Sequence, residues 1–364
     1  MYKHFYHRKR RSGGTGARFT VLALAALFVG VFIGSVLKNS PEDKEKPALL
    51  PLVPESSPMP DALFVPSETA KPAVTEAVGT VALPSSELTV SVKGVPVEME
   101  LEDYLVGVVA AEMSVSSEPA ALRAQAVAAR TFTALHMQGR ASCRSGCTVC
   151  DDHRCCQAYF SPDELERAWG EKYAENIEKI RSAVRSTEGL VVTFEGELIS
   201  ALYHASSGRA TENSEEVFAA ALPYLVSVDS FEGDSEMVSV QEFPLTTVVD
   251  KLNSLYPDAH LTVPLDEKDF DVWGRTDSGR VQLVRIGHSV ITGSALRLAL
   301  GLKSAAFTVE FDDDSITFTC LGYGHGVGMS QLGANEMAKD GAGFEEILAH
   351  FYTGTDLSRL TYGS

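Results

Sequence analysis

Residues 101–137, with the sequence LEDYLVGVVAAEMSVSSEPAALRAQAVAARTFTALHM, decide how this chain folds. Apolar residues recur at helical spacing after Asp103 and again after Pro119, so the stretch predicts two helices joined by a short turn. Serine is favoured as a helix cap and proline in a first turn, and we therefore expect Ser117 to cap the second helix. In that helix Arg130 lies on a face other than the apolar one.

Glu112 is the only charged residue in the segment VGVVAAEMSVSS, and it falls in the last turn of the first predicted helix. The negative end of the helix dipole and the apolar neighbours both disfavour the ionised carboxylate, which predicts a raised pKa. An acid that keeps its proton near neutral pH suits a general acid acting on a glycosidic oxygen. The alternative is an ordinary surface glutamate on an amphipathic helix.

The first residues predict a membrane anchor. Residues 1–18 carry six Lys or Arg and no acid, and residues 19–37 form an uncharged run long enough to cross a bilayer as a helix. The basic flank predicts a cytoplasmic N-terminus, a single span and an extracytoplasmic location for the rest of the chain. A cleaved signal peptide has similar parts, but this apolar run is longer than usual and no Ala-x-Ala site precedes Lys38, so we favour an uncleaved anchor.

Residues 38–86 predict an extended extracytoplasmic linker, because nine of the sixteen prolines lie there among Ser, Glu and Ala. A small folded domain is the alternative. The whole chain has 31 Lys and Arg, six of them in the basic tail, against 49 Asp and Glu. A surface this acidic repels polyphosphate backbones, which argues against nucleic acid as a partner.

Residues 87–364 predict the folded part. Alternating apolar residues indicate hairpins that turn at Lys93-Gly94 and Glu195-Gly196, and a helical stretch over 161–186 begins at a Ser161 cap. Further segments are a helix at about 245–256, strands near 280–286 and 305–320, a helix near 293–301, and a last helix around FEEILAHFYTG. Because helices and strands alternate without a regular βαβ repeat, we expect an α+β fold. A helical subdomain carrying Glu112 and the cysteines would pack beside a mainly β part.

A glycine-rich loop, GYGHGVGMSQLGANEMAKDG, precedes a predicted helix that Gly341 should end. Glycine at this density permits positive φ and close backbone approach, and it would present His325 and Gln331 at a rim. The loop lacks the Gly-Lys-Ser/Thr ending of a phosphate-binding loop. A purely structural glycine turn is the alternative to a functional loop.

Tyr203, His204, Ser206 and Ser207 gather polar groups at a strand end. A serine hydrolase would need a base oriented toward its serine, and neither a Gly-x-Ser-x-Gly elbow nor a Ser-x-x-Lys motif with Lys-Thr-Gly is present. We therefore interpret these groups as hydrogen-bonding partners for a sugar. Trp169 and Tyr173, four residues apart, predict core contacts, with a sugar-stacking platform as the alternative.

Five cysteines fall within residues 143–156, and His153 lies among them. Cys147 and Cys150 have the Cys-x₂-Cys spacing of a tetrahedral zinc site. An extracytoplasmic location also permits disulfides, so a disulfide staple remains the alternative. Cys320, at a predicted strand end, is interpreted as a plain buried thiol.

Several long motifs carry a resemblance to a known family. EMELEDYLVGVVAAEM with ALRAQAVAARTF, then VCDDHRCCQAY, ALYHASSGRATENSEEVF and GYGHGVGMSQLGANEMA, resemble the stage II sporulation protein D family of lytic transglycosylases. The resemblance implies that Glu112 protonates the bond between N-acetylmuramic acid and N-acetylglucosamine and then deprotonates the muramoyl 6-hydroxyl. It also implies glycan contacts from Gln125, Arg130, Tyr203, His204, Ser206, Ser207, Gly324, His325 and Gln331.

Some members of that family hold zinc with one histidine and two cysteines in this insertion. Cys150 and Cys156 match those cysteines, but the histidine position falls on Arg144. Cys143, Cys147 or His153 would have to substitute, in a structural rather than hydrolytic zinc site. The resemblance further implies engulfment during sporulation, glycan strands stripped of stem peptides, and two partners, the amidase stage II sporulation protein P and the membrane protein stage II sporulation protein M.

Two other functions compete with a lytic transglycosylase. One is a non-catalytic enhancer of a wall amidase, since proteins with this domain occur in that role. The other is a zinc amidase that uses the Cys/His cluster together with His204 or His325.

Overall fold

The computed structural model describes residues 79–363 except 219, 234–236 and 266–267. The predicted basic tail, the predicted membrane span at 19–37 and all but the end of the predicted linker lie outside the described residues. Within the part that is described, no helix has both the length and the apolar character needed to cross a bilayer.

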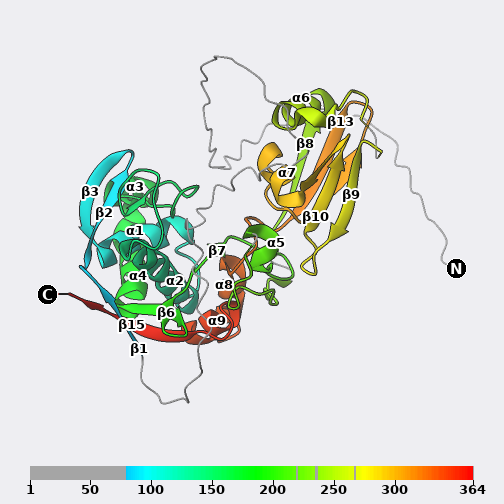
Figure 1. Ribbon diagram of the computed structural model, residues 1–364. Helices are drawn as coiled ribbons and strands as arrows, with labels where there is room; N and C mark the ends of the chain where they lie inside the picture. The colour runs from blue at the N-terminus through cyan, green and yellow to red at the C-terminus, as the bar shows by residue number, and fades with distance from the viewer. Residues whose placement is uncertain (1–78, 219, 234–236, 266–267, 364) are drawn as a thin grey trace, which may run out of the picture. The chain divides into compact units, whose positions relative to one another are not determined.

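The elements alternate along the chain (Figure 1). The helices are α1 Leu101–Glu112, α2 Pro119–Met137, α3 Pro162–Trp169, α4 Tyr173–Ser186, α5 Ser214–Phe218, α6 Leu245–Leu255, α7 Gly293–Leu300, α8 Gln331–Lys339 and α9 Phe344–Phe351, with short 3₁₀ helices at Gly170–Lys172 and Pro257–Ala259. The strands are β1 Gly79–Leu83, β2 Glu87–Val92, β3 Val95–Glu100, β4 Val149–Cys150, β5 Leu190–Phe194, β6 Glu197–Leu198, β7 Tyr203–His204, β8 Val238–Pro244, β9 Phe270–Arg275, β10 Val281–Ile286, β11 Ser289–Thr292, β12 Phe307–Phe311, β13 Ser315–Leu321, β14 Met329–Ser330 and β15 Asp356–Tyr362. This mixture confirms the predicted α+β class.

Both predicted hairpins are confirmed. β2 pairs antiparallel with β3 around Lys93-Gly94, whose φ angles are 51° and 80°. β5 pairs antiparallel with β6 around Glu195-Gly196, with φ angles of 53° and 85°. Two successive positive φ angles match the twist of the flanking strands, which is why a glycine stands second in each turn.

The helices α1 and α2 confirm the two-helix prediction, but the cap of α2 is not Ser117. The helix begins at Pro119, so the preceding residue, Glu118, occupies the cap position and its side chain makes no capping hydrogen bond. The Glu118 N–H instead donates to Asn335 Oδ1 at 2.8 Å. This contact joins the start of α2 to α8.

The predicted helical stretch 161–186 is divided into α3 and α4. Its beginning is as predicted, because the Ser161 N–H and hydroxyl both donate to the Glu164 carboxylate, which completes a capping box. Gly170 then ends α3 with a φ of 53°. Trp169 packs against the first core described below, which confirms the interpretation of this side chain as a core contact.

The first core is built from both ends of the described chain, from residues 81–225 and 327–360. Helices α1, α2 and α4 pack with a sheet of strand order β1-β15-β5-β6. β1 pairs in parallel with β15, in register from Gly79↔Ser358 to Leu83↔Tyr362. Folded structure therefore starts before the predicted boundary at residue 87, and a strand rather than the predicted helix α9 closes the fold.

The second core consists only of residues between 245 and 320. It packs α6 and α7 with two three-stranded sheets, in the orders β11-β10-β9 and β12-β13-β8. The region predicted as strand over 305–320 is a hairpin of β12 and β13 that turns through Asp312–Asp314. Cys320 lies in this core with no exposed surface, as predicted.

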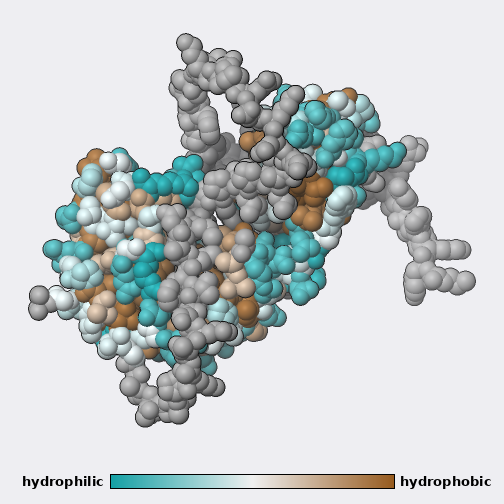
Figure 2. Space-filling view, viewed as in Figure 1, coloured by the Kyte–Doolittle hydropathy of each residue, from teal (hydrophilic) through white to brown (hydrophobic). Residues whose placement is uncertain are grey.

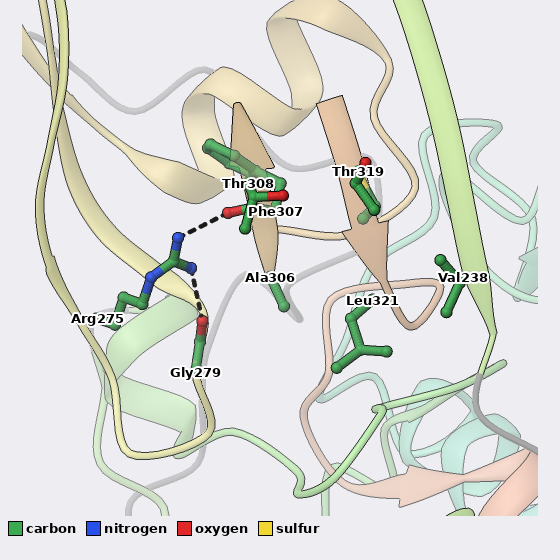
Figure 3. Close-up of a pocket in the computed structure, with 9 residues that line it drawn as sticks. Val238, Arg275, Gly279, Ala306, Phe307, Thr308, Thr319 and Leu321 are labelled. Atoms are coloured by element: carbon green, nitrogen blue, oxygen red, sulfur yellow. Dashed lines mark hydrogen bonds between the residues drawn. The ribbon is translucent and has the colours of Figure 1, made fainter. Parts of the chain in front are cut away.

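A hollow of about 250 Å³ opens beside the second core (Figure 3). Its lining contains none of the predicted site residues, and Arg275 there donates to the carbonyl oxygens of Gly279 and Phe307. Hydrophilic residues predominate on much of the described surface shown in Figure 2, with apolar patches between them. The hollow offers mainly apolar surface and a satisfied guanidinium, so we do not interpret it as the functional site.

Candidate active site

Glu112 is the last residue of α1, as the sequence predicted. The next residue, Met113, is extended, with φ −125° and ψ 148°, so the chain leaves the helix directly after the carboxylate. The Ala158 N–H donates to Glu112 Oε1 at 2.7 Å, and Gln331 Nε2 lies 3.4 Å from Oε2. Part of the side chain remains accessible to solvent.

Burial raises the pKa of Glu112 to about 7. Hydrogen bonds from Ala158 and Gln331 and the nearby Tyr203 hydroxyl favour the carboxylate and lower the pKa, but they do not cancel the loss of hydration. The carboxyl group is therefore poised to gain or lose a proton near neutral pH. This is the property that the sequence predicted for a general acid.

Two glutamines from different helices meet beside this acid. Gln331 is the first residue of α8, whose cap Ser330 accepts a hydrogen bond from the Gly333 N–H. Gln331 Nε2 also lies 3.3 Å from Oε1 of Gln125, a fully buried residue of α2. The structure thus brings together three predicted site residues, Glu112, Gln125 and Gln331, from three separate segments.

Tyr203 extends the site from β7. Its hydroxyl donates to Gln157 Oε1 at 2.8 Å, and Gln157 Nε2 donates to Thr133 Oγ1 at 3.0 Å. The sequence prediction missed Gln157 and the backbone of Ala158. Both directly follow Cys156 in the motif VCDDHRCCQAY. That this motif extends past the cysteines was the only feature of the sequence that could have indicated them.

His204, Ser206 and Ser207 are buried rather than presented to solvent. His204 Nδ1 lies 3.1 Å from the Val327 carbonyl oxygen and therefore carries the proton, which leaves Nε2 to accept from the Ser207 hydroxyl. Burial lowers the pKa of His204 well below its usual range, so its imidazole is neutral. These contacts hold the loop together, and a direct sugar contact of these three side chains stays a prediction.

Glu232, which the sequence did not single out, organises the same loop. Its carboxylate accepts hydrogen bonds from the Ser206 hydroxyl, from the N–H groups of Ser207 and Gly208, and from the Ser330 hydroxyl. The side chain is almost completely buried. Glu232 therefore fixes the 206–208 loop to the start of α8, next to Gln331.

The four glycines of the glycine-rich loop have φ angles between 73° and 119°, which confirms the predicted backbone freedom. A Cβ at Gly324 would lie 2.7 Å from the His204 Cβ, so the loop lies flat against β7 only because glycine stands there. His325 packs its ring against His204 and Phe218. Burial lowers the pKa of His325 to about 3, so it is a neutral spacer beside the site.

The sequence around this site matches a known family. A family profile described as "Stage II sporulation protein" matches residues 92–194, which include Glu112 and Gln157. Stage II sporulation protein D of Bacillus amyloliquefaciens is 38% identical over 274 residues, 74% of this chain and 76% of the relative. The chain belongs to the stage II sporulation protein D family.

Two further relatives are similar to this chain. Stage II sporulation protein D of Bacillus subtilis is 37% identical over 274 residues, again 74% of this chain and 76% of the relative. A protein named "Amidase enhancer" from Bacillus subtilis is 29% identical over 303 residues, 70% of this chain but 40% of that protein.

In this member of the stage II sporulation protein D family, Arg130 is fully buried. Its side chain has no exposed surface, and it forms a two-bond ion pair with Glu102, at 2.8 and 2.6 Å. Further bonds go to the carbonyl oxygens of Val184 and Leu190. Arg130 therefore ties α2 to α1, α4 and β5, and its sugar contact stays a prediction.

Four cysteines form the one group in the described residues that could hold a metal ion. The sulfur atoms of Cys143, Cys150, Cys155 and Cys156 all lie within 4.8 Å of one another. Cys147 and His153, which the sequence offered as ligands, are outside this group, and Cys155 takes part instead. The local chain path explains the change, because β4 places Cys150 beside β2 and the following turn brings Cys155 and Cys156 back to it.

The cysteine geometry fits a metal better than disulfides. The Cys143–Cys155 and Cys155–Cys156 sulfur separations are 3.9 and 4.0 Å, and all described cysteines are free thiols. A tetrahedral zinc–thiolate site with bonds of about 2.3 Å places its sulfurs roughly 3.8 Å apart, whereas a disulfide requires about 2.05 Å. A hydrogen bond from Cys156 lowers the pKa of Cys150 to about 6, whereas burial raises the pKa of Cys155 and the interaction with Cys150 raises that of Cys156, so of these three only Cys150 is a thiolate at neutral pH before a metal binds.

Proposed function

We propose that this protein is a membrane-anchored lytic transglycosylase of peptidoglycan, with Glu112 as its acid and base. The observation that carries the proposal is one carboxyl group with a pKa near 7, held between the Ala158 N–H and Gln331 at the meeting point of α1, α2 and α8. Membership of the stage II sporulation protein D family supports a role in the sporulation cell wall.

The two oxygens of Glu112 have different surroundings. Oε1 accepts the short bond from Ala158, so the proton resides on Oε2, where Gln331 approaches at 3.4 Å. In the first step this proton moves to the glycosidic oxygen, and the bond from that oxygen to C1 of N-acetylmuramic acid breaks with its electron pair going to the oxygen. Gln331 then stabilises the Glu112 carboxylate that remains.

The second step regenerates the acid. The muramoyl C6 hydroxyl attacks C1, and Glu112 takes the hydroxyl proton as a 1,6-anhydro ring closes. No water is consumed, so a second carboxylate to activate water is not needed. Two buried acids of the loops, Glu232 and Glu212, agree with this, because both are occupied by hydrogen bonds from hydroxyl and backbone N–H groups.

We propose zinc as a structural ion at Cys143, Cys150, Cys155 and Cys156. When bound, it would fix the segment that continues through Gln157 to Ala158, and so hold the N–H that contacts Glu112. Four thiolates leave no open coordination position for catalysis, which argues against a zinc amidase. Metal analysis of the purified protein, with Cys155→Ser as the variant and Cys147→Ser as the control, tests this ligand set.

The cellular setting is also part of the proposal. Residues 19–37 would anchor the protein in the cell membrane by a single span with a cytoplasmic N-terminus, and the catalytic part would act outside it during engulfment. Its substrate would be glycan free of stem peptides, and its partners stage II sporulation proteins P and M. These statements extend the family resemblance to this chain.

The test is the chemistry of the released glycan ends. Wild-type protein incubated with stem-peptide-free glycan should give 1,6-anhydro-muramoyl products, one water lighter than reducing ends by mass spectrometry. Glu112→Gln should abolish them, whereas Glu171→Gln, the same change at an exposed glutamate, should not. Reducing ends, or full activity of Glu112→Gln, would overturn the proposal.

One further candidate is favoured by a specific observation, the 29% identity to a protein named "Amidase enhancer". A non-catalytic enhancer would release no glycan products alone. It would stimulate an added wall amidase equally well with Gln at position 112. The same Glu112→Gln variant therefore separates the two functions.

A further inference from the structure

Tyr323 and Lys303 lie together at the rim of the glycine-rich loop, outside the site described above. The Lys303 ammonium lies 4.6 Å from the centre of the Tyr323 ring and 3.5 Å from its hydroxyl. Tyr323 is 42% exposed, and Lys303 is half-buried. The ammonium covers one face of the ring in a cation–π contact, and the exposed remainder of the ring lies beside a positive charge, an arrangement that suits a sugar ring carrying a negative charge.

The backbone holds Tyr323 firmly in this exposed position. Its N–H and carbonyl exchange hydrogen bonds with Ser206, at 2.7 and 3.0 Å. Gly322 and Gly324 flank it at positive φ, and a Cβ at Gly322 would lie 2.7 Å from the Ser206 carbonyl oxygen. The Gly324 N–H donates to the Lys303 carbonyl at 2.9 Å, which fixes the lysine to the same loop. The pair is therefore preorganised, and binding would cost little ordering of the loop.

Within the part of the chain that the structure describes, no carboxylate neutralises the charge of Lys303. Its ammonium contacts the Tyr323 ring and hydroxyl. The protein has 49 acidic residues against 31 basic ones, so its overall field repels an anionic polymer. To bind such a polymer, the protein would need a local cation at the place where the polymer carries its negative charge.

The loop that carries Tyr323 also leads to the site. Tyr323 pairs with Ser206, and the Ser206 hydroxyl donates to Glu232, which also accepts from the Ser330 hydroxyl. The next residue, Gln331, lies beside Glu112. One hydrogen-bonded loop therefore joins the pair to the acid.

Resting on the proposed function, we propose that Tyr323 and Lys303 form a distal subsite for a muramic acid residue. Tyr323 would pack against the sugar ring, and Lys303 would bind the lactyl carboxylate. That carboxylate is negatively charged only where no stem peptide is attached to it through an amide bond. The subsite would thus select stretches of glycan free of stem peptides, at a position away from the bond that is cleaved.

The test uses the full chain in detergent and two substrates. One is stem-peptide-free glycan, and the other is the same glycan after its lactyl carboxylates are converted to methylamides. Lys303→Met should raise KM for the anionic glycan by about two- to fivefold, the range of an ion pair near the surface, with kcat unchanged. Lys303→Arg should restore the wild-type KM, and Lys339→Met, which removes an exposed lysine of α8, should have no effect.

The amidated glycan provides the decisive comparison. Wild type should lose the same factor on amidated glycan, and Lys303→Met should no longer differ from wild type there. Tyr323→Phe should keep binding, whereas Tyr323→Ala should weaken binding of both substrates. Equal KM values for Lys303→Met and Lys339→Met, or an effect of Lys303→Met that survives amidation, would overturn the subsite.

The outcome is independent of whether glycan is cleaved. Co-sedimentation of the Glu112→Gln variant with insoluble glycan measures binding alone, with and without Lys303→Met. If binding of the two glycans differs in a Lys303-dependent way but wild type releases no anhydro products, the subsite is supported and the transglycosylase activity is refuted. Anhydro products with no such difference would do the reverse.

Discussion

Replacing Glu112 by Gln should stabilise the protein at alkaline pH while it removes the proposed acid. Burial raises the pKa of Glu112 from 4.5 to about 7, so between these values the folded state binds more protons than the unfolded state. The free energy of unfolding therefore falls as pH rises through this window. At about 1.36 kcal/mol per pKa unit, the penalty above pH 7 is about 3 kcal/mol, an upper value because part of the side chain stays in water.

Glutamine carries no charge and so avoids this penalty. Near pH 4 the two proteins should have the same stability, and at pH 8 the Glu112→Gln variant should melt roughly 5 to 10 °C higher. Melting temperatures measured by circular dichroism between pH 4 and pH 9 check this, with Glu171→Gln as the matched control. A difference that does not change with pH would refute the reasoning that a desolvated carboxylate lies at this position.

Three further predictions follow from the site and its supports. If Glu112 must be protonated to start the reaction, kcat/KM on glycan should fall as pH rises through about 7, and a rate that is flat from pH 6 to 8 would contradict the assignment. Arg130→Met should lower the free energy of unfolding by about 3 kcal/mol, because it leaves Glu102 unpaired, while glycan affinity of the folded protein stays unchanged in a sedimentation assay. Gly326→Ala should lower both stability and activity, since φ is +87° there and a Cβ would lie 2.2 Å from the Arg280 guanidinium carbon; unchanged melting would show that the loop adapts.

Local pattern was enough to predict the position of the acid and much of the secondary structure. Glu112 ends α1 because apolar spacing defines the helix, and Lys93-Gly94 turns because the alternation on either side of it defines two strands. These features depend on residues close in sequence. A short stretch of sequence therefore contains the information that predicts them.

The contacts that surround the acid depend on residues far apart in sequence. Ala158 and Gln331 approach Glu112 from 46 and 219 residues away, and nothing in their local sequence indicates that partner. The glycan contact expected of Arg130 came from the family resemblance, and the local sequence did not indicate its ion-pair partner Glu102, which lies on another helix. The alternation of residues around Ser206 and Ser207 likewise does not indicate that both donate hydrogen bonds to the buried carboxylate of Glu232.

The parallel pairing of β1 with β15 bears on how the chain acquires its structure. Strand partners such as Gly79 and Ser358 are almost the whole described length apart, so this sheet closes only after synthesis has passed residue 362. Closing so long a loop is slow, because the chain loses conformational entropy before the contacts between the two strands can stabilise it. A ribosome-bound chain must therefore keep its first strand unpaired until the final one emerges, and deleting residues 356–362 would leave that strand without its neighbour.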